Sequence, residues 1–322
     1  MNTLLIVNPQ SSGGRTGRIL PQLERTLSHS LEGEYHIEQT REARHATRLA
    51  RQAAKDGYQR VVAIGGDWTL NEVINGLMQA SQEDKCEKLP VLGLIPQGTG
   101  GDFRRSFAIE HRLDHYLRKL NEADTHSLDI GKAEFVDHQG NPKKHYFVNI
   151  LSAGLGGLVD QYVEESKGGN SGKASYFMAS LKAMRCSKLA RLRCTVDLRV
   201  GEGEKVDQRT FVLGSRNIAI CNGRYFGGGM HVAPMAKTDD GTFEVINFSA
   251  PKRLQLAAMS RKLYDGKHLQ LPHVQHFQAS SIRLELIDES IQKDFLLDID
   301  GEALGCLPLH IEVLPAALQI QL

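Results

Sequence analysis

The chain has 322 residues, more than a single hydrophobic core usually serves, so two domains are expected. Hydrophobic residues make up 41% and charged residues 24%, which is typical of a folded globular protein. The formal net charge of +1 excludes a strong overall field that would attract nucleic acid or an anionic membrane. No nucleic-acid partner is therefore expected, and any membrane attraction requires a local patch.

The cysteines and the N-terminus indicate a cytoplasmic protein. The five cysteines are odd in number and form no CxxC pair, which argues against a disulfide framework or a zinc site. Met1 to Pro9 runs directly into a strand-like segment, without the basic region and cleavage site of a signal peptide. No apolar stretch approaches the ~20 residues needed to span a bilayer.

Residues 1–127 alternate between strand and helix signals, and glycine-rich turns follow the strands. The expected strands are Leu4–Val7, Val61–Ile64 and Val91–Ile95, and the expected helices are Ile19–Leu31, Ala43–Lys55 and Leu70–Ala80. This alternation predicts an α/β domain with a doubly wound parallel sheet.

From residue 128 to residue 307 most segments are strand-like and separated by turn signals, which predicts an antiparallel β domain. The expected strands are Ser127–Glu134, His145–Ile150, Cys194–Val200, Thr210–Cys221, Thr242–Phe248, Ser281–Leu286 and Phe295–Ile299. Helical patterns interrupt them at Gly172–Ala190 and Lys252–Tyr264. A last strand, Leu309–Leu314, lies in a segment, 308–322, that we expect to return to the first domain.

The segment from Val61 to Val73 carries the most specific signal. A buried-type strand ends in Gly65-Gly66, and Asp67-Trp68-Thr69 leads at once into a helix. Glycine lets the backbone approach an oxyanion closely, and a helix N-terminus adds N–H groups and the positive end of a dipole. The pattern suits a phosphate site, although a tight turn in any parallel sheet would look the same.

Further motifs follow in order along the chain. They are Leu94–Phe103, Asn222–Met230 with Pro234-Met235-Ala236 and Asp239-Asp240-Gly241 after it, Asp298–Glu302, and the opening Asn8-Pro9 with Gly13 and Gly14. Together with Val61–Val73, they resemble the diacylglycerol-kinase catalytic domain, with its GGDGTxNEV loop, its P-x-GTxNDFAR turn and its DGE motif. The resemblance covers nearly the whole chain. It implies an NAD-kinase-like and diacylglycerol-kinase-like α/β domain followed by an antiparallel β-sandwich.

The resemblance also implies a function, a lipid kinase that uses ATP and Mg²⁺ to phosphorylate the hydroxyl of a diacylglycerol-like lipid. Glu302 would be the general base, with Asp300 as a second catalytic residue. Asp240 would hold the metal, helped by carbonyl groups at Lys237 and Thr242, and Asp129 would help to order this region. The nucleotide would be lined by Asn8, Gly13, Gly14, Thr40, Gly65, Gly66, Asp67, Trp68, Thr69, Leu70, Asn71 and Thr99.

These roles agree with the chemistry of phosphoryl transfer, which needs charge neutralisation, an oriented nucleophile and oxygen ligands for a hard cation. Even so, Asp239-Asp240-Gly241 and Asp300-Gly301-Glu302 are also ordinary hairpin-turn sequences.

Two residues depart from the family pattern. Gly101 replaces an asparagine, and Trp68 replaces the glycine of GGDGT. If that glycine provides a positive φ or a close approach to phosphate, an indole there is costly. Trp68 leaves three alternatives open, namely a pseudokinase that binds lipid or nucleotide, a shifted but active loop, and an indole that stacks on the base. An NAD-kinase-like enzyme is a further alternative.

A lipid substrate implies transient contact with a membrane surface and a peripheral location. Residues Gly172 to Arg193 carry six basic residues interleaved with apolar ones, which predicts a basic amphipathic helix suited to anionic headgroups. A solvated helix face over a β core is the alternative. The resemblance also allows a homodimer.

Overall fold

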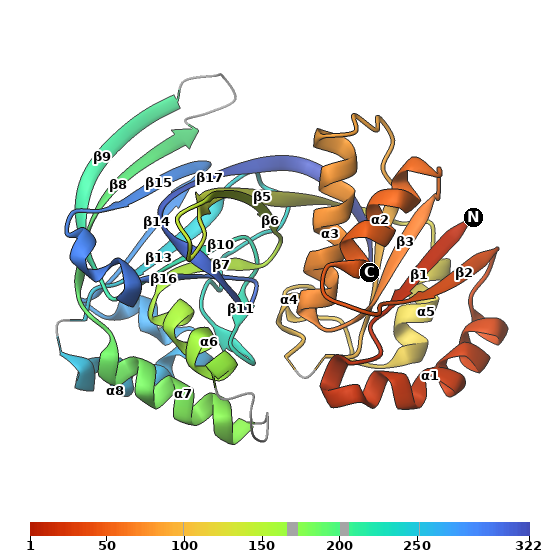
Figure 1. Cartoon of the computed structure of the whole chain (residues 1–322), viewed down its shortest axis with the longest axis horizontal. Helices are drawn as coiled ribbons and strands as arrows, with labels where there is room; N and C mark the ends of the chain where they lie inside the picture. The colour runs from red at the N-terminus through yellow and green to blue at the C-terminus, as the bar shows by residue number, and fades with distance from the viewer. Residues whose placement is uncertain (99, 166–172, 200–205, 251) are drawn as a thin grey trace. The chain divides into compact units, whose positions relative to one another are not determined.

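The computed structural model describes the whole chain except residues 99, 166–172, 200–205 and 251. The chain divides into two compact units, which are described separately. Unit 1 comprises Met1–Ile130 and Pro315–Leu322, and unit 2 comprises Gly131–Leu314. Two strands, β5 (His126–Val136) and β17 (Glu302–Gln321), cross the boundaries between the units (Figure 1).

Unit 1 contains a parallel sheet with the order β17-β4-β3-β1-β2. Its own strands are β1 (Thr3–Val7), β2 (Tyr35–Gln39), β3 (Arg60–Gly65) and β4 (Val91–Pro96). Every residue of β1 and β3 is buried, as expected for strands covered on both faces. The last residues of β17 join the sheet beside β4, where Ile320 pairs with Leu92.

Helices cover both faces of this sheet (Figure 1). They are α1 (Ser11–Ser30), α2 (His45–Lys55), α3 (Asp67–Gln82), the short α4 (Asp102–Arg105) and α5 (Leu113–Asn121). α1 and α5 bury leucines against Leu5, Val62 and Ile95 on one face. α2 and α3 pack together, and a Cβ at Gly76 of α3 would lie 2.3 Å from the carbonyl oxygen of Thr47.

Unit 2 is an antiparallel β-sandwich. One layer has the order β14-β13-β10-β7-β16-β17, and the other has the order β9-β8-β15-β17. β5 pairs with β17 on one side and with β6 on the other. The strands are β6 (Pro142–Phe147), β7 (Ile150–Gly154), β8 (Ala190–Arg199), β9 (Val206–Ser215), β10 (Asn217–Cys221), β13 (Phe243–Phe248), β14 (Val274–Ala279), β15 (Ser281–Leu286) and β16 (Leu296–Ile299). A separate small hairpin joins β11 (Tyr225–Phe226) to β12 (Met230–His231). The core draws apolar side chains from both layers, such as Leu151 of β7 and Leu192 of β8.

The helices of unit 2 are α6 (Leu155–Glu165), α7 (Lys173–Cys186) and α8 (Arg253–Tyr264), with 3₁₀ turns η1 (Lys267–Gln270) and η2 (Glu289–Asp294). α6 packs on β7 and β16 and against α7. None of the described helices is long and apolar enough to cross a membrane.

The predicted fold class is confirmed, but three predicted elements are wrong in detail. α7 ends at Cys186, and the chain from Ala190 is the strand β8, so Gly172–Arg193 is not one helix. The predicted strand His145–Ile150 spans the break between β6 and β7 at Val148-Asn149. Thr210–Cys221 likewise spans the break at Arg216 between β9 and β10. The predicted domain boundary at residues 127–128 falls inside β5.

Candidate functional site

The loops that follow the parallel strands of unit 1 meet at the carboxyl edge of the sheet. The clearest contact is between Gly66, after β3, and Gly98, after β4. A Cβ on Gly98 would lie 2.5 Å from the Cα of Gly66, so the two backbones touch and no side chain fits between them. The N–H groups of Gln97 and Gly98 both donate to the carbonyl oxygen of Gly65, at 2.6 and 3.1 Å. Phosphate-binding turns need this kind of close glycine packing.

The loop after β1 is held to the same place. Asn8 Nδ2 donates to Thr69 Oγ1 at 3.1 Å, and Ser12 Oγ donates to the carbonyl oxygen of Gln97 at 2.5 Å. Ser12, Gly13 and Gly14 have φ values of 54°, 63° and 81°, so a left-handed turn interrupts the start of α1. Two of these three residues are glycine, which adopts this conformation at the least cost.

The loop after β2 begins with Thr40 and lies at the same edge of the sheet. The N–H of Thr40 donates to the carbonyl oxygen of Val7 at 2.8 Å. The described residues predicted to line a nucleotide therefore gather at the carboxyl ends of β1, β2 and β3, and Thr99 lies outside the described residues.

Trp68 is the second residue of α3, and its backbone lies outside the left-handed region. Gly66 has φ −85° and ψ −177°, so this turn needs no positive φ at either position. The conformational cost considered for Trp68 is thus absent. Its indole is partly exposed, so its effect on a nucleotide depends on the space it occupies.

Four residues that follow Trp68 are buried. Thr69 is 2% exposed, and both Leu70 and Asn71 are 0% exposed, so Leu70 could offer a nucleotide only its backbone. Glu72 has a structural role, because its carboxylate accepts the N–H groups of Arg44 at 2.8 Å and Ala46 at 3.2 Å at the start of α2. The helical part of the motif therefore supports the loop, while Gly66, Asp67 and Trp68 remain accessible.

Asp67 joins this loop to the one after β4. Its Oδ2 accepts the N–H of Asp102 at 3.1 Å. Burial raises the pKa of Asp67, while the N–H groups of residues 101–103 and the charge of Arg104 oppose that rise.

Two arginines beside this loop were not predicted from the sequence. The guanidinium of Arg105 lies 3.5 Å from the carbonyl oxygen of Gly100, and a Cβ on Gly101 would lie 2.8 Å from Arg104 Nε. Burial lowers the pKa of His111, and the charges of Arg104, Arg105 and Arg15 lower it further. The guanidinium of Arg105 also lies 3.5 Å from Asp102. Such cations suit a polyphosphate. The signal was present, because Arg104 and Arg105 directly follow Asp102-Phe103 in one of the motifs.

In unit 2, Asp300 and Gly301 form the two-residue turn between β16 and β17, with Ile299 paired to Glu302. Both turn residues have positive φ, 50° and 96°, as a tight hairpin requires. The Asp300 carboxylate accepts three backbone N–H groups at 3.0 Å, from Val148, Asn149 and Ile150. Asp300 thus anchors the turn to the β6–β7 junction, and Glu302 follows it with its side chain partly exposed.

The same junction is bonded to the glycine-rich segment that begins at Asn222. Asn222 Nδ2 donates to the carbonyl oxygen of Val148 at 2.8 Å, and Asn149 Nδ2 donates to that of Tyr225 at 2.8 Å. The Tyr225 ring stacks on His231 across the β11–β12 hairpin, with centroids 4.3 Å apart. The Asn222–Met230 motif is therefore connected to the Asp298–Glu302 motif through residues 148–150.

Asp298 was not assigned a role from the sequence, yet its carboxyl is buried beside this turn. It is 6% exposed, and its carboxylate accepts the N–H of Gly301 at 2.8 Å. Burial raises the pKa of Asp298 to about 6; the nearby Asp300 charge also raises it, while hydrogen bonds from Gly301, Asp160 and Ser152 oppose the rise.

The predicted metal ligands lie in the turn before β13. Asp240 is exposed, and one of its carboxylate oxygens accepts both the N–H and the hydroxyl of Thr242, at 3.1 and 3.0 Å. Across the described part of the chain, no three His, Cys, Asp or Glu side chains come together as a metal site. The turn offers a hard cation one carboxylate and backbone carbonyls, a set that suits Mg²⁺ with most of its waters retained.

Asp129 supports the fold of unit 1. It is 1% exposed, and its carboxylate accepts the N–H of Ala316 at 2.7 Å, which fastens the end of β17.

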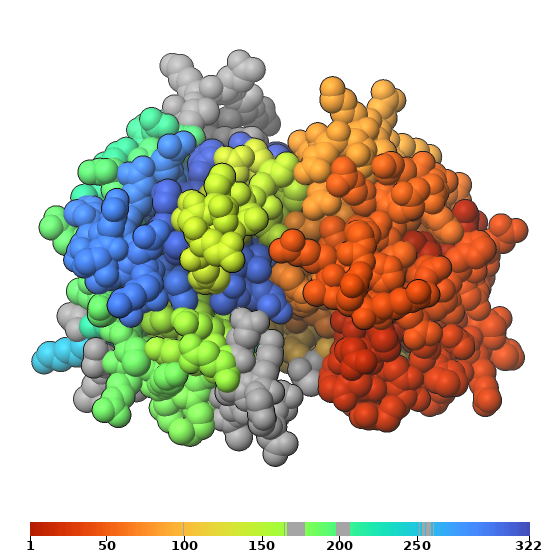
Figure 2. All heavy atoms as spheres, in the orientation of Figure 1, coloured from red at the N-terminus to blue at the C-terminus, as the bar shows by residue number. Residues whose placement is uncertain are grey.

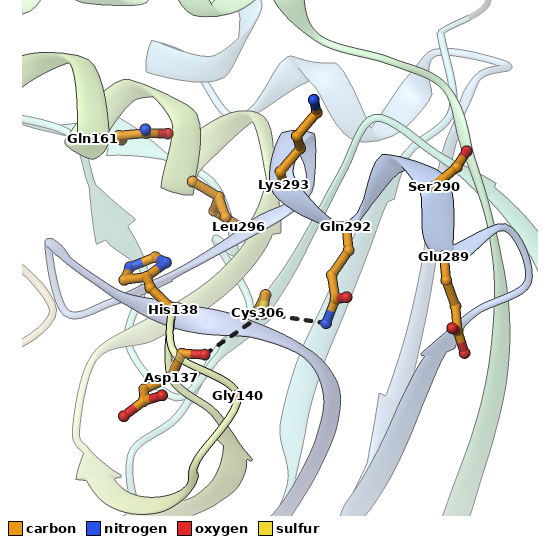
Figure 3. A pocket seen from close by; sticks show the side chains of 10 residues that line it. All are labelled: Asp137, His138, Gly140, Gln161, Glu289, Ser290, Gln292, Lys293, Leu296 and Cys306. Carbon is orange, nitrogen blue, oxygen red and sulfur yellow. Dashed lines mark hydrogen bonds between the residues drawn. The ribbon is translucent and has the colours of Figure 1, made fainter.

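A hollow of about 450 Å³ lies elsewhere in unit 2 and contains none of the predicted site residues (Figure 3). Asp137, His138, Gln161, Gln292 and Cys306 are among its lining residues. Gln292 Nε2 donates to Cys306 Sγ at 3.3 Å across its floor, and burial raises the pKa of that thiol. Several of these polar groups are bonded to one another, and none of them supplies chemistry for the predicted reaction.

Comparison with known proteins identifies the family. The diacylglycerol kinase catalytic domain matches residues 2–133, and the YegS C-terminal NAD kinase beta sandwich-like domain matches residues 149–322. The chain belongs to the diacylglycerol-kinase family. It is 30% identical to the lipid kinase YegS of Escherichia coli K12 over 321 residues, covering 99% of this chain and 95% of that protein.

A solved structure gives the same fold. The crystal structure of a diacylglycerol kinase from Bacillus anthracis matches with a TM-score of 0.65 at 21% identity, covering 99% of this chain and 96% of that one. At this identity the match supports the fold alone. The resemblance on which the sequence analysis rested is therefore confirmed, and the roles of the individual site residues stay predictions.

Proposed function

We propose that this protein is a lipid kinase that transfers the γ-phosphoryl group of ATP to the hydroxyl of a diacylglycerol-like lipid, with Mg²⁺. The observation that carries the proposal is the contact between Gly66 and Gly98 at the carboxyl edge of the parallel sheet. The loops after β1, β3 and β4 converge there, with Arg104 and Arg105 beside the loop after β4. A polyphosphate is the ligand that such backbone packing and positive charge suit best.

Unit 1 would hold the nucleotide, and unit 2 would supply the base. Glu302 would accept the proton of the lipid hydroxyl as that oxygen attacks the γ-phosphorus and the bond to the β-phosphate oxygen breaks. Asp300 would keep Glu302 in place, because its carboxylate fixes the turn to three backbone N–H groups. Asp240 and the carbonyls of Lys237 and Thr242 would hold Mg²⁺, which when bound neutralises phosphate charge.

The test is transfer of radiolabelled phosphate from ATP to a panel of lipids that includes diacylglycerol, phosphatidylglycerol, ceramide and sphingosine. We expect Glu302→Gln to lower kcat by roughly 100- to 10,000-fold, the usual contribution of a positioned base. Glu289→Gln, on the exposed turn η2, is the matched control and should leave kcat unchanged. If folded protein labels no lipid, or if Glu302→Gln is as active as wild type, the assignment is wrong.

A nucleotide-binding protein with impaired catalysis is the second candidate, because Trp68 occupies the first turn of α3 beside the glycine contact. Its backbone is unstrained there, which favours an active loop. Trp68→Gly separates the two candidates, since a large gain in transfer would mean that the indole blocks the wild-type site. An NAD-kinase-like activity would be revealed by phosphorylation of NAD in the same assay.

A further inference from the structure

Helix α7 presents two large apolar side chains to solvent, whereas two alanines and the partly buried Met184 pack on the protein. Met178 and Leu181 are 62% and 42% exposed, whereas Ala179 and Ala183 are 5% and 0% exposed. Met178, Leu181, Lys182 and Arg185 follow the spacing of one helix face, which places two large apolar groups beside two cations. The alternative considered for this segment, a solvated helix face over a β core, would instead present mainly polar side chains to water.

Three more exposed large apolar side chains lie on the sheet that follows α7 in the chain. Leu189 is 44% exposed, Val212 on β9 is 54% exposed, and Ile287 after β15 is 40% exposed. Ile287 and Leu189 lie near Arg191 of β8, because Ile287 donates its N–H to the Arg191 carbonyl oxygen and Gly214, next to Leu189, pairs with Arg191. Val212 pairs with Arg193, two residues further along β8. Among the described residues, five of the seven exposed large apolar side chains belong to α7 and this neighbouring sheet. Figure 2 shows atoms of this stretch, coloured green, at the molecular surface.

The same stretch is rich in positive charge. Lys182 pairs with Glu165 at 3.1 Å, Lys188 with Asp294 at 2.7 Å and Arg193 with Glu285 at 3.1 Å. Arg185 and Arg191 are exposed, and neither has an acidic partner in the described part of the chain. We name the set Met178, Leu181, Arg185, Leu189, Arg191, Val212 and Ile287 the α7–β8 face.

We propose that the α7–β8 face docks on an anionic lipid bilayer, with Met178 and Leu181 inserted among the acyl chains and Arg185 and Arg191 bound to headgroup phosphates. Apolar side chains that point away from the core are costly in water and are stabilised at a lipid interface. Unpaired arginines add attraction for a negatively charged surface. The proposal rests on the proposed function and deepens it, since a lipid kinase acts on a substrate that is held in a bilayer.

Sedimentation of the whole protein with vesicles tests this proposal without turnover. Vesicles that contain phosphatidylglycerol should bind the wild type, and vesicles of pure phosphatidylcholine should bind it far less. Each arginine near the surface contributes about fivefold to partitioning, so Arg185→Gln/Arg191→Gln should weaken binding by about 25-fold. Met178→Gln/Leu181→Gln should weaken it by roughly tenfold or more, since both apolar contacts with lipid are lost.

The matched control is Arg25→Gln/Lys88→Gln, which removes the same charge from exposed positions of unit 1. It should bind vesicles like the wild type, and all variants should keep wild-type transfer to a lipid dispersed in detergent micelles. Wild-type vesicle binding by both face variants would overturn the proposal while leaving the kinase assignment intact. Absence of transfer in micelles would instead refute the kinase assignment. If the Met178/Leu181 variant dissociates a dimer in analytical ultracentrifugation and still binds vesicles, the face is a contact between two copies.

Discussion

Replacing Asp300 by asparagine tests how the catalytic turn is held. In the wild type, one carboxylate oxygen accepts the N–H groups of Asn149 and Ile150, and the other accepts that of Val148. Asparagine tolerates the positive φ of this position and keeps one acceptor oxygen. Its amide nitrogen, however, is a donor and would face the N–H of Val148.

The expected loss follows from these bonds. A hydrogen bond to a charged group contributes about 1.5–3 kcal/mol, and a buried donor left without an acceptor costs about 1–3 kcal/mol. Asp300→Asn should therefore lower the unfolding free energy of unit 2 by about 2–4 kcal/mol. For a unit of this size, that corresponds to a fall in Tm of roughly 5–12 °C.

Thermal unfolding and amide hydrogen exchange measure the two parts of this prediction. The amides of residues 148–150 should exchange faster in Asp300→Asn, and kcat should fall because Glu302 is less firmly placed. Asp239→Asn, in an exposed turn, should change neither Tm nor exchange at residues 148–150. Wild-type protection of these three amides in Asp300→Asn would refute the anchoring role of the carboxylate.

Three more variants test other parts of the account. Gly98→Ala should weaken ATP binding at least about tenfold and destabilise unit 1 by about 1–3 kcal/mol, because the new Cβ meets the Gly66 backbone at 2.5 Å. Calorimetry measures both effects, and the control is Gly214→Ala, whose new Cβ has room. Glu72→Gln should destabilise unit 1 by about 1–2 kcal/mol in urea unfolding, because the amide leaves one of the two N–H groups at the start of α2 without an acceptor and gives the other an uncharged one. Equal stability of the variant would contradict this capping role. The raised pKa of Asp298, about 6, means that the folded state binds more protons than the unfolded state between about pH 4 and pH 6, so the carboxyl lowers wild-type stability as pH rises through that range. Asp298→Asn removes this dependence, and its stability relative to wild type should improve by up to about 3 kcal/mol between about pH 4 and pH 8 in urea titrations; a pH-independent difference would contradict the shift.

The parallel-sheet domain could be predicted well because its signals are local. Apolar strands such as Val61–Ile64 end in glycines, and helices with a regular apolar period follow them. The breaks at Val148-Asn149 and at Arg216 could not be predicted, because neither contains the glycine or proline that marks a turn. Both breaks depend on partners that are distant in the sequence. The Asp300 carboxylate binds the backbone at the first break, and the carbonyl oxygens of Ser187 and Ala250 accept hydrogen bonds from the Arg216 guanidinium at the second.

The site shows the same division between local and distant information. The motif around Gly65 is one unbroken stretch of sequence, and so is the turn at Asp300. Each could therefore be found by resemblance. The raised pKa of Asp298 results mainly from burial, and Asp160 and Ser152, whose hydrogen bonds oppose the rise, are far away in the sequence. The outward direction of Met178 and Leu181 depends on which side of α7 the core covers, and an apolar pattern on both sides of a helix does not reveal it.

The single tryptophan of the chain provides the most direct test of the central claim, because Trp68 lies beside the glycine contact that is proposed to hold the phosphates. Titration of the protein with ATP, with and without Mg²⁺, should change the Trp68 emission in a saturable way, and Gly98→Ala should move the midpoint to an ATP concentration at least about tenfold higher. Unchanged emission together with no heat of ATP binding in calorimetry would contradict the account.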